Sequence, residues 1–299
     1  MKLKPYTTAP LCAAALYFLT LMYGWLTDGA DLPSAWRLPL VGIAQTLACL
    51  LPAVVWLFVY RDFNARRLRF ALPRMVSLGT LALLLACLLL GSALLSLVGK
   101  RVGFDTAETS GVSGTANPWL TLFTLCVLPA VCEEFLFRGV LLCAFEVCGT
   151  RAAIVGTSML FAFAHMSLEK FVTYFFCSVI LCFAVYVSRS LLAAVLLHAV
   201  YNIVSVYSGV YLSGVAAHLE SFALLFIVML LLLLVLTIFA LSSASRVYRV
   251  YADENLSSDY TPQKLRGAAK LRAGASVYFS LPFLLCALIF AAVVILRMR

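Results

Sequence analysis

The sequence predicts an all-α protein, a polytopic transmembrane helix bundle of about eight or nine spans with no soluble domain. Hydrophobic residues make up 64% of the 299 residues and charged residues only 12%, whereas soluble domains are near half apolar and a quarter charged. The apolar residues gather in runs of about 20, the length that crosses a hydrocarbon core as a helix. Long unbroken runs such as 224–236 lack the alternation of an outer-membrane barrel, so the spans are expected to be helices.

Apolar runs between charged and Gly/Pro-containing breaks give nine candidate spans, of which the fifth is short. Their approximate bounds are 9–26, 38–60, 72–98, 118–147, 152–166, 169–188, 190–213, 220–243 and 275–296. We group them as three N-terminal helices in 1–117, a central helical core in 118–212, and C-terminal helices in 213–299. The first run resembles a signal peptide, but it is long for one and no clear cleavage site follows. We therefore expect a retained first helix.

Basic residues account for the net charge of +9, and they occur in short clusters between apolar runs. This pattern is typical of charges sorted to one membrane face and argues against nucleic-acid binding. One cluster follows the second span, and another lies in the polar segment 246–274, which we interpret as a cytoplasmic loop. The first comprises Arg61, Arg66, Arg67, Arg69 and Arg74, and the second Arg246, Arg249, Lys264, Arg266, Lys270 and Arg272.

Both clusters lie in the cytoplasm if the N-terminus is inside, although Lys100, Arg101, Arg297 and Arg299 then fall on the wrong side. We see no organelle-targeting signal, so the expected location is a bacterial cytoplasmic (inner) membrane. Ten cysteines are present, and no CxxC pair occurs among them. Most lie in apolar runs, where cysteine packs as a small hydrophobe.

Three charged residues lie near the middle of the fourth span, where charges are expensive and indicate function. Glu134 and Arg138 are four residues apart, so they share a helix face and can pair. Glu133 is rotated by about 100° from Glu134 and has no such local partner, which makes it a candidate general base. A buried network that only fixes helix packing is the structural alternative.

The following spans add three polar side chains to this group. His165 ends one apolar run, and His198 and Asn202 share a face of another. Polar side chains in membrane helices turn towards one another or a watery cavity. The set supplies a carboxylate base, imidazoles and an amide donor, the parts needed for water-mediated amide hydrolysis. Serine chemistry fits less well because no GxSxG turn is present.

These residues form three motifs in order: EExxxR at 133–138, FxxxH at 161–165 and HxxxN at 198–202. In this respect the chain resembles the CAAX protease and bacteriocin-processing family, also called Abi or type II CAAX prenyl endopeptidases. The resemblance covers about 118–212. It implies an intramembrane glutamic endopeptidase whose cavity is reachable from the cytoplasm or inner leaflet.

By that resemblance Glu133, assisted by His165, activates water, and His198 and Asn202 stabilise the oxyanion. Glu134 and Arg138 are then supporting residues, and Phe161 forms part of the cavity wall. The substrate is expected to be a protein or peptide at the lipid bilayer, with no cofactor.

Three alternatives stay open. Glu133, His165 and His198 could form a zinc site, although no HExxH pairing is present. The buried charges could instead line an ion path in a transporter or channel. The chain could also be a non-catalytic scaffold or immunity protein.

Overall fold

The computed structural model confirms the all-α prediction and contains no strand in the residues that it describes. These are residues 4–28, 30, 33–60, 68–104, 117–217, 222–254 and 267–298. Among them six helices are long and apolar enough to cross a membrane, or seven if one bent pair counts as a single span. The chain is therefore an integral membrane protein. Of the other predicted spans, one is the short helix Thr150–Ala164, and the other is the 27-residue helix Leu191–Ala217, whose side chains are described only as far as Tyr207.

The three N-terminal spans lie close to their predicted positions. They are α2 (Pro10–Thr27), which follows the short α1 (Pro5–Thr8), then α3 (Ser34–Val59) and α4 (Leu78–Arg101). Lipid-length apolar runs specify such helices directly, since every backbone group must be paired within the segment.

The fourth span is a single irregular helical column from Pro118 to Cys148. Its regular parts are α5 (Pro118–Leu122), α6 (Leu128–Glu134) and α7 (Leu142–Phe145), separated by π-helical turns at Phe123–Val127 and Phe135–Leu141. Single π-turns inside α-helices are frequent at functional sites. The second one begins directly after the diglutamate.

Gly149 ends this column with a φ of +96°, a conformation that glycine adopts without the strain of a Cβ atom. The next helix, α8 (Thr150–Ala164), has 15 residues and is too short to span. It is followed by α9 (Leu168–Ser188) and α10 (Leu191–Ala217). Helix α10 has 27 residues, and its side chains are described over Leu191–Tyr207, which is apolar.

The C-terminal part differs from the prediction in its polar segment. Helix α11 (Phe222–Asp253) continues well past the predicted end of its span, and α12 (Gly267–Tyr278) begins before the predicted last span. Segment 246–274 is thus helical at both ends and not a loop throughout, while 255–266 lie outside the described residues. Helix α12 meets α13 (Leu281–Arg297) at a 42° bend.

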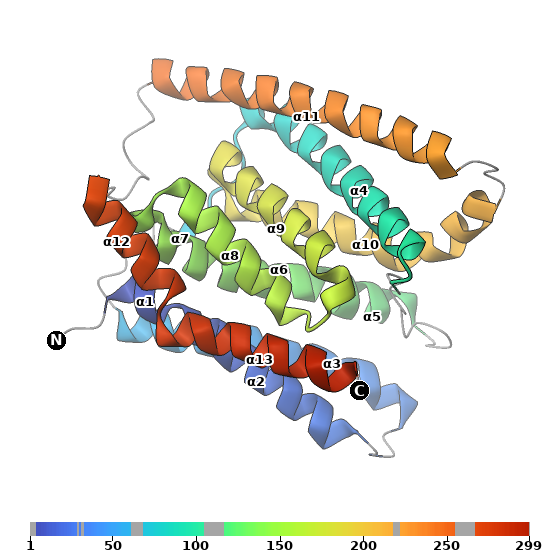
Figure 1. Ribbon diagram of the computed structural model, residues 1–299, viewed down its shortest axis with the longest axis vertical. Coiled ribbons are helices and arrows are strands. Elements are labelled where there is room, and N and C mark those ends of the chain that lie inside the picture. Colours follow the sequence, from blue (N-terminus) through green and yellow to red (C-terminus); the bar gives the residue numbers. More distant parts are fainter. Residues whose placement is uncertain are drawn as a thin grey trace.

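The helices form a layered bundle with the irregular column near its centre (Figure 1). Helix α11 packs along α4 at one side, and α2, α3 and α13 form the opposite side, with α8 and α9 between them. Helices α4 and α9 approach closely at Gly91, where a Cβ atom would lie 2.3 Å from the Phe176 ring. The most exposed span is α11, whose apolar surface faces outwards.

At one end of the bundle, contacts connect the basic segments that the sequence predicts on the same side of the membrane. Arg69 pairs with Glu146 at 2.6 Å, and both side chains are buried. Arg74 pairs with Glu254 at 3.4 Å, and the Arg189 guanidinium lies 4.2 Å from the centre of the Tyr251 ring. We call this the basic end. The further predicted bases Arg61, Arg66, Arg67, Lys264, Arg266 and Arg299 lie outside the described residues.

Candidate active site

The ion pair predicted from helix spacing is present at the centre of the bundle. Arg138 Nη1 lies 2.6 Å from Glu134 Oε1, and neither side chain has exposed surface. The other terminal nitrogen of Arg138 donates to Ser178 on α9, at 2.9 Å to Oγ and 3.2 Å to the carbonyl oxygen. These bonds compensate part of the large cost of burying both charges.

Glu134 also holds the second histidine of the predicted group. His198 Nδ1 lies 2.8 Å from Glu134 Oε1. A carboxylate paired with arginine can only accept, so Nδ1 must carry the hydrogen and donate it. The ring therefore presents Nε2 on its other side, where Glu133 Oε2 lies 3.9 Å away. The hydrogen bond between His198 and Glu134 could not be predicted from the spacing of Glu134 and Arg138. That bond depends on how the column and α10 are rotated about their axes.

Glu133 occupies a more open position than its neighbour, with a side chain that is 14% exposed. Its Oε1 accepts a hydrogen bond of 2.9 Å from Gln45 Nε2 on α3. Its Oε2 is the oxygen nearer to His198. The two glutamates are therefore unlike: Glu134 is enclosed with a cation, and Glu133 faces a cavity.

His165 follows the last residue of α8 and lies between two aromatic rings. Its Nδ1 is 2.9 Å from the carbonyl oxygen of Phe161 and donates to it, since a carbonyl has no hydrogen to give. The Tyr174 ring stacks on the imidazole with 3.6 Å between centroids, and the Phe161 ring lies at 4.9 Å. Nε2 is thus the nitrogen left for other partners.

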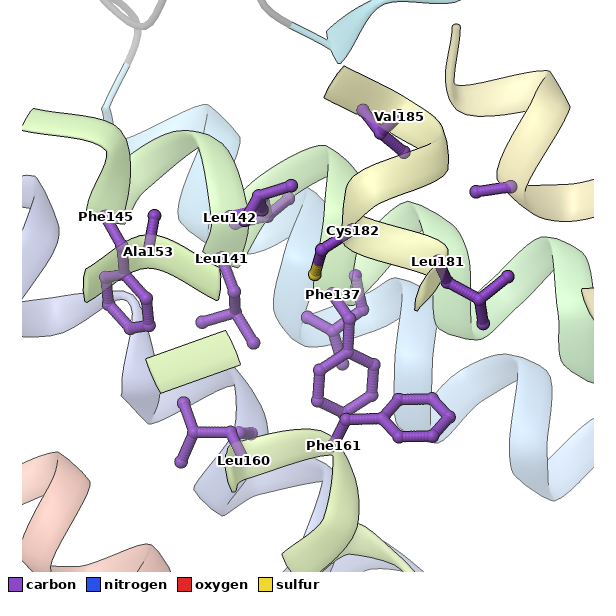
Figure 2. Packing of buried hydrophobic residues seen from close by; sticks show 14 of the residues in the cluster. Phe137, Leu141, Leu142, Phe145, Ala153, Leu160, Phe161, Leu181, Cys182 and Val185 are labelled. Carbon is purple, nitrogen blue, oxygen red and sulfur yellow. The ribbon is translucent and has the colours of Figure 1, made fainter. Parts of the chain in front are cut away.

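Phe161 joins the polar group to the apolar core. Its ring lies 5.9 Å from His198 and 4.7 Å from the Arg138 guanidinium, a cation–π distance. Figure 2 shows its ring next to that of Phe137, and the two meet edge to face at 5.1 Å. It forms part of the cavity wall, in the position that the resemblance implies.

Asn202 follows His198 by one helical turn and points in the same general direction. Its Nδ2 donates to the carbonyl oxygen of Cys126 at 3.3 Å. That carbonyl lies in the first π-turn of the column. An amide nitrogen has two hydrogens, so one remains for a ligand.

A cavity of about 270 Å³ contains most of these residues. Glu133, Phe161, His165, His198 and Asn202 line it, whereas Glu134 and Arg138 lie behind the wall. The remaining walls are largely apolar, with one further amide and two tyrosines: Gln45, Leu125, Pro129, Tyr174, Cys177, Leu181, Tyr201 and Val206.

The cavity extends from Glu133 away from the basic end. Its lining residues on the column, Leu125 and Pro129, precede Glu133, and Val206 lies further along α10 than His198. Towards the basic end the column is tightly packed, with Phe137, Leu141 and other side chains fully buried (Figure 2). With the N-terminus inside, this cavity would face away from the cytoplasm. That conflicts with the cytoplasmic access implied by the resemblance.

The zinc alternative concerns Glu133, His165 and His198. Among the described residues no group of three or more His, Cys, Asp or Glu side chains is arranged to hold a metal ion. Glu133, His165 and His198 line one cavity without forming such a group.

The helix that carries His165 is held by the two ends of the chain. Three side chains from α2, α12 and α13 donate hydrogen bonds to backbone carbonyl oxygens of α8 or of the turn after it. These bonds join Tyr17 to Leu160, Tyr278 to Ala152 and Arg297 to Met166. Met166 has a positive φ of 49°, so Arg297 stabilises a turn that is unfavourable for this residue.

Comparison with known proteins identifies the central part of the chain. Residues 115–204 match the family model for Rce1-like type II CAAX prenyl endopeptidases. This central segment is similar to the Rce1-like family. It contains all three motifs and therefore confirms the resemblance seen in the sequence. The Rce1-like family is one of membrane-embedded proteases. Comparison with curated proteins found no match, and comparison with solved structures found none either.

Reasoning from the sequence missed the other cavity residues, among them Gln45, which bonds Glu133, and Tyr174, which stacks on His165. Gln45 stands alone in an apolar run, and nothing in its spacing connects it to the motifs. Its polarity inside a membrane helix was nevertheless a usable signal, because such groups seek partners. Tyr174 gave no signal, since a tyrosine in α9 is as expected for packing as for contact with His165.

Proposed function

We propose that this chain is an intramembrane endopeptidase in which Glu133 activates water to hydrolyse a peptide bond of a membrane-associated protein or peptide. The observation that carries the proposal is the contrast between the two glutamates. Glu134 is neutralised by Arg138, while Glu133 lies at a cavity with one oxygen directed towards His198. Glu133 lies at the cavity without an arginine or lysine partner among the lining residues, and its carboxylate can take a proton from a water molecule there.

The histidine geometry supports distinct roles. In neutral His165 the nitrogen Nε2 is an acceptor, since Nδ1 donates to Phe161. It can therefore help Glu133 to orient and deprotonate the attacking water. His198 has its Nδ1 hydrogen engaged by Glu134, so it donates from Nε2 only as an imidazolium.

The proposed reaction then follows from these positions. Glu133 accepts a proton as the water oxygen bonds to the scissile carbonyl carbon. The oxyanion that forms accepts hydrogen bonds from Asn202 Nδ2 and from His198 Nε2. Glu133 next returns its proton to the leaving nitrogen as the C–N bond breaks. The lining residues include no lysine or arginine that could hold a free carboxylate terminus, which favours cleavage within a chain.

The test is Glu133→Gln in the full-length protein. Membrane peptides from cells with wild-type protein and with the variant are compared by mass spectrometry. A peptide that accumulates only with the variant identifies a substrate, and its cleavage by purified protein should fall by about 10²- to 10⁴-fold. Glu169→Gln is the matched control, since Glu169 is exposed at the start of α9. Full cleavage by a folded Glu133→Gln variant would refute the proposal.

Two further measurements separate the alternatives. Inhibition by a chelator that Zn²⁺ reverses would replace the metal-free mechanism with a zinc mechanism. Ion flux in liposomes that Glu133→Gln stops, without any hydrolysis, would favour a transporter.

A further inference from the structure

Gln45 is a cavity residue that bonds directly to the proposed base. It lies on α3, whose exposed side chains nearby are apolar, such as Ile43 and Leu47. Its Nε2 donates to Glu133 Oε1 at 2.9 Å. The residue lies outside 115–204, the part of the chain that matches the Rce1-like family.

This bond removes a freedom that an isolated glutamate would have. The terminal torsion of a glutamate side chain is broad and nearly two-fold, so either oxygen can face a ligand. Gln45 occupies Oε1, and Oε2 is the oxygen that lies 3.9 Å from His198 Nε2. The carboxylate is thereby presented in one orientation to the cavity.

Gln45 is also suited to this position by its chemistry. An amide donates without titrating and brings no charge, so it does not neutralise the carboxylate as an arginine would. The contrast with Arg138 is direct: a cation holds Glu134, whereas a neutral donor holds Glu133. A neutral partner fixes geometry and leaves the base able to accept a proton.

We propose that Gln45 is a positioning residue of the hydrolytic site, which holds Glu133 Oε1 so that Oε2 meets the attacking water. The proposal rests on the proposed function. It makes α3 a part of the site and extends the site beyond the family segment.

Gln45→Met tests the proposal because methionine has nearly the same length and no donor. Kinetics are measured on the peptide identified by the Glu133→Gln comparison. We expect kcat to fall by about 10- to 100-fold, the effect of losing one hydrogen bond to a charged group, with KM changed by less than about twofold. Gln45→Glu should have a kcat lower still than that of Gln45→Met, because two carboxylates would then face each other.

Thr46→Val is the matched control on the same helix. Thr46 bonds the carbonyl oxygen of Gly42 at 2.7 Å and does not line the cavity. It should keep kcat within about twofold. Two results would refute positioning and assign the effect to packing of α3. One is a loss of kcat in Thr46→Val equal to that in Gln45→Met. The other is a rise of KM in Gln45→Met that accounts for its whole loss of kcat/KM.

The outcomes also separate the two proposals. If folded Glu133→Gln still cleaves, the proposed function fails. If Glu133→Gln is inactive and Gln45→Met has wild-type kcat, only the positioning role fails. A third variant, Gln45→Leu, provides the same readout if Gln45→Met does not fold.

Discussion

The buried pair of Glu134 and Arg138 should be a major determinant of stability, and Arg138→Met is the change that tests it. The substitution removes the 2.6 Å contact with Glu134 and two bonds to Ser178. It leaves a carboxylate with no exposed surface and no arginine, and His198 remains as its hydrogen-bond partner. Breaking a buried pair on one side costs about 3–5 kcal/mol, so the unfolding equilibrium constant should rise by about 10²- to 10⁴-fold.

Arg74→Met is the matched control, because it breaks an ion pair of the same type at the surface. Arg74 and Glu254 are 3.4 Å apart, with side chains 47% and 54% exposed. Such pairs contribute about 0–1 kcal/mol. Unfolding of purified protein in mixed micelles, titrated with sodium dodecyl sulfate and followed by circular dichroism, compares the two variants.

The double variant Glu134→Gln with Arg138→Met should recover part of the loss, since it leaves no buried charge unpaired. The reasoning would be wrong if Arg138→Met cost no more free energy of unfolding than Arg74→Met. It would also be wrong if the double variant were less stable than Arg138→Met alone.

Three further predictions follow from the bundle. Val206→Cys lies in the cavity, and Ser245→Cys lies near the basic end. The two cysteines should react with an impermeant maleimide from opposite sides of the membrane. Labelling of both from one side would contradict the position of the cavity. Arg69→Met should lower the free energy of unfolding by about 3–5 kcal/mol, because Glu146 is also buried; a loss below 1 kcal/mol in the same micelle titration would refute this. Arg297→Gln should reduce cleavage by a few-fold, about 1 kcal/mol for one lost bond at the Met166 carbonyl, and Arg297→Lys should restore part of it.

Much of the fold could be predicted because lipid leaves few choices. Apolar length alone located α2, α3, α4 and α9, since a helix is the only open-chain structure that pairs its own backbone in a membrane. Length could not separate a span from a short buried helix, as α8 shows with its 15 residues. Nor could it locate the bend between α12 and α13.

The site was predictable where its geometry is local. The pairing of Glu134 with Arg138 follows from the four-residue spacing. The bond from His198 to Glu134, and not to Glu133, depends on the rotation of two helices 64 residues apart. Gln45 is 88 residues from Glu133 and belongs to no motif. Contacts of this kind are set by packing between helices, which spacing along one helix does not determine.

The hydrogen bonds to α8 carry a consequence for biosynthesis. Tyr17 leaves the ribosome long before its partner Leu160, and Arg297 leaves it long after Met166, with separations of 143 and 131 residues. The turn after His165 therefore gains its arginine only when α13 has been translated. If cleavage depends on that turn, activity should rise by a few-fold as α13 packs, after most of the described helices are already in the bilayer.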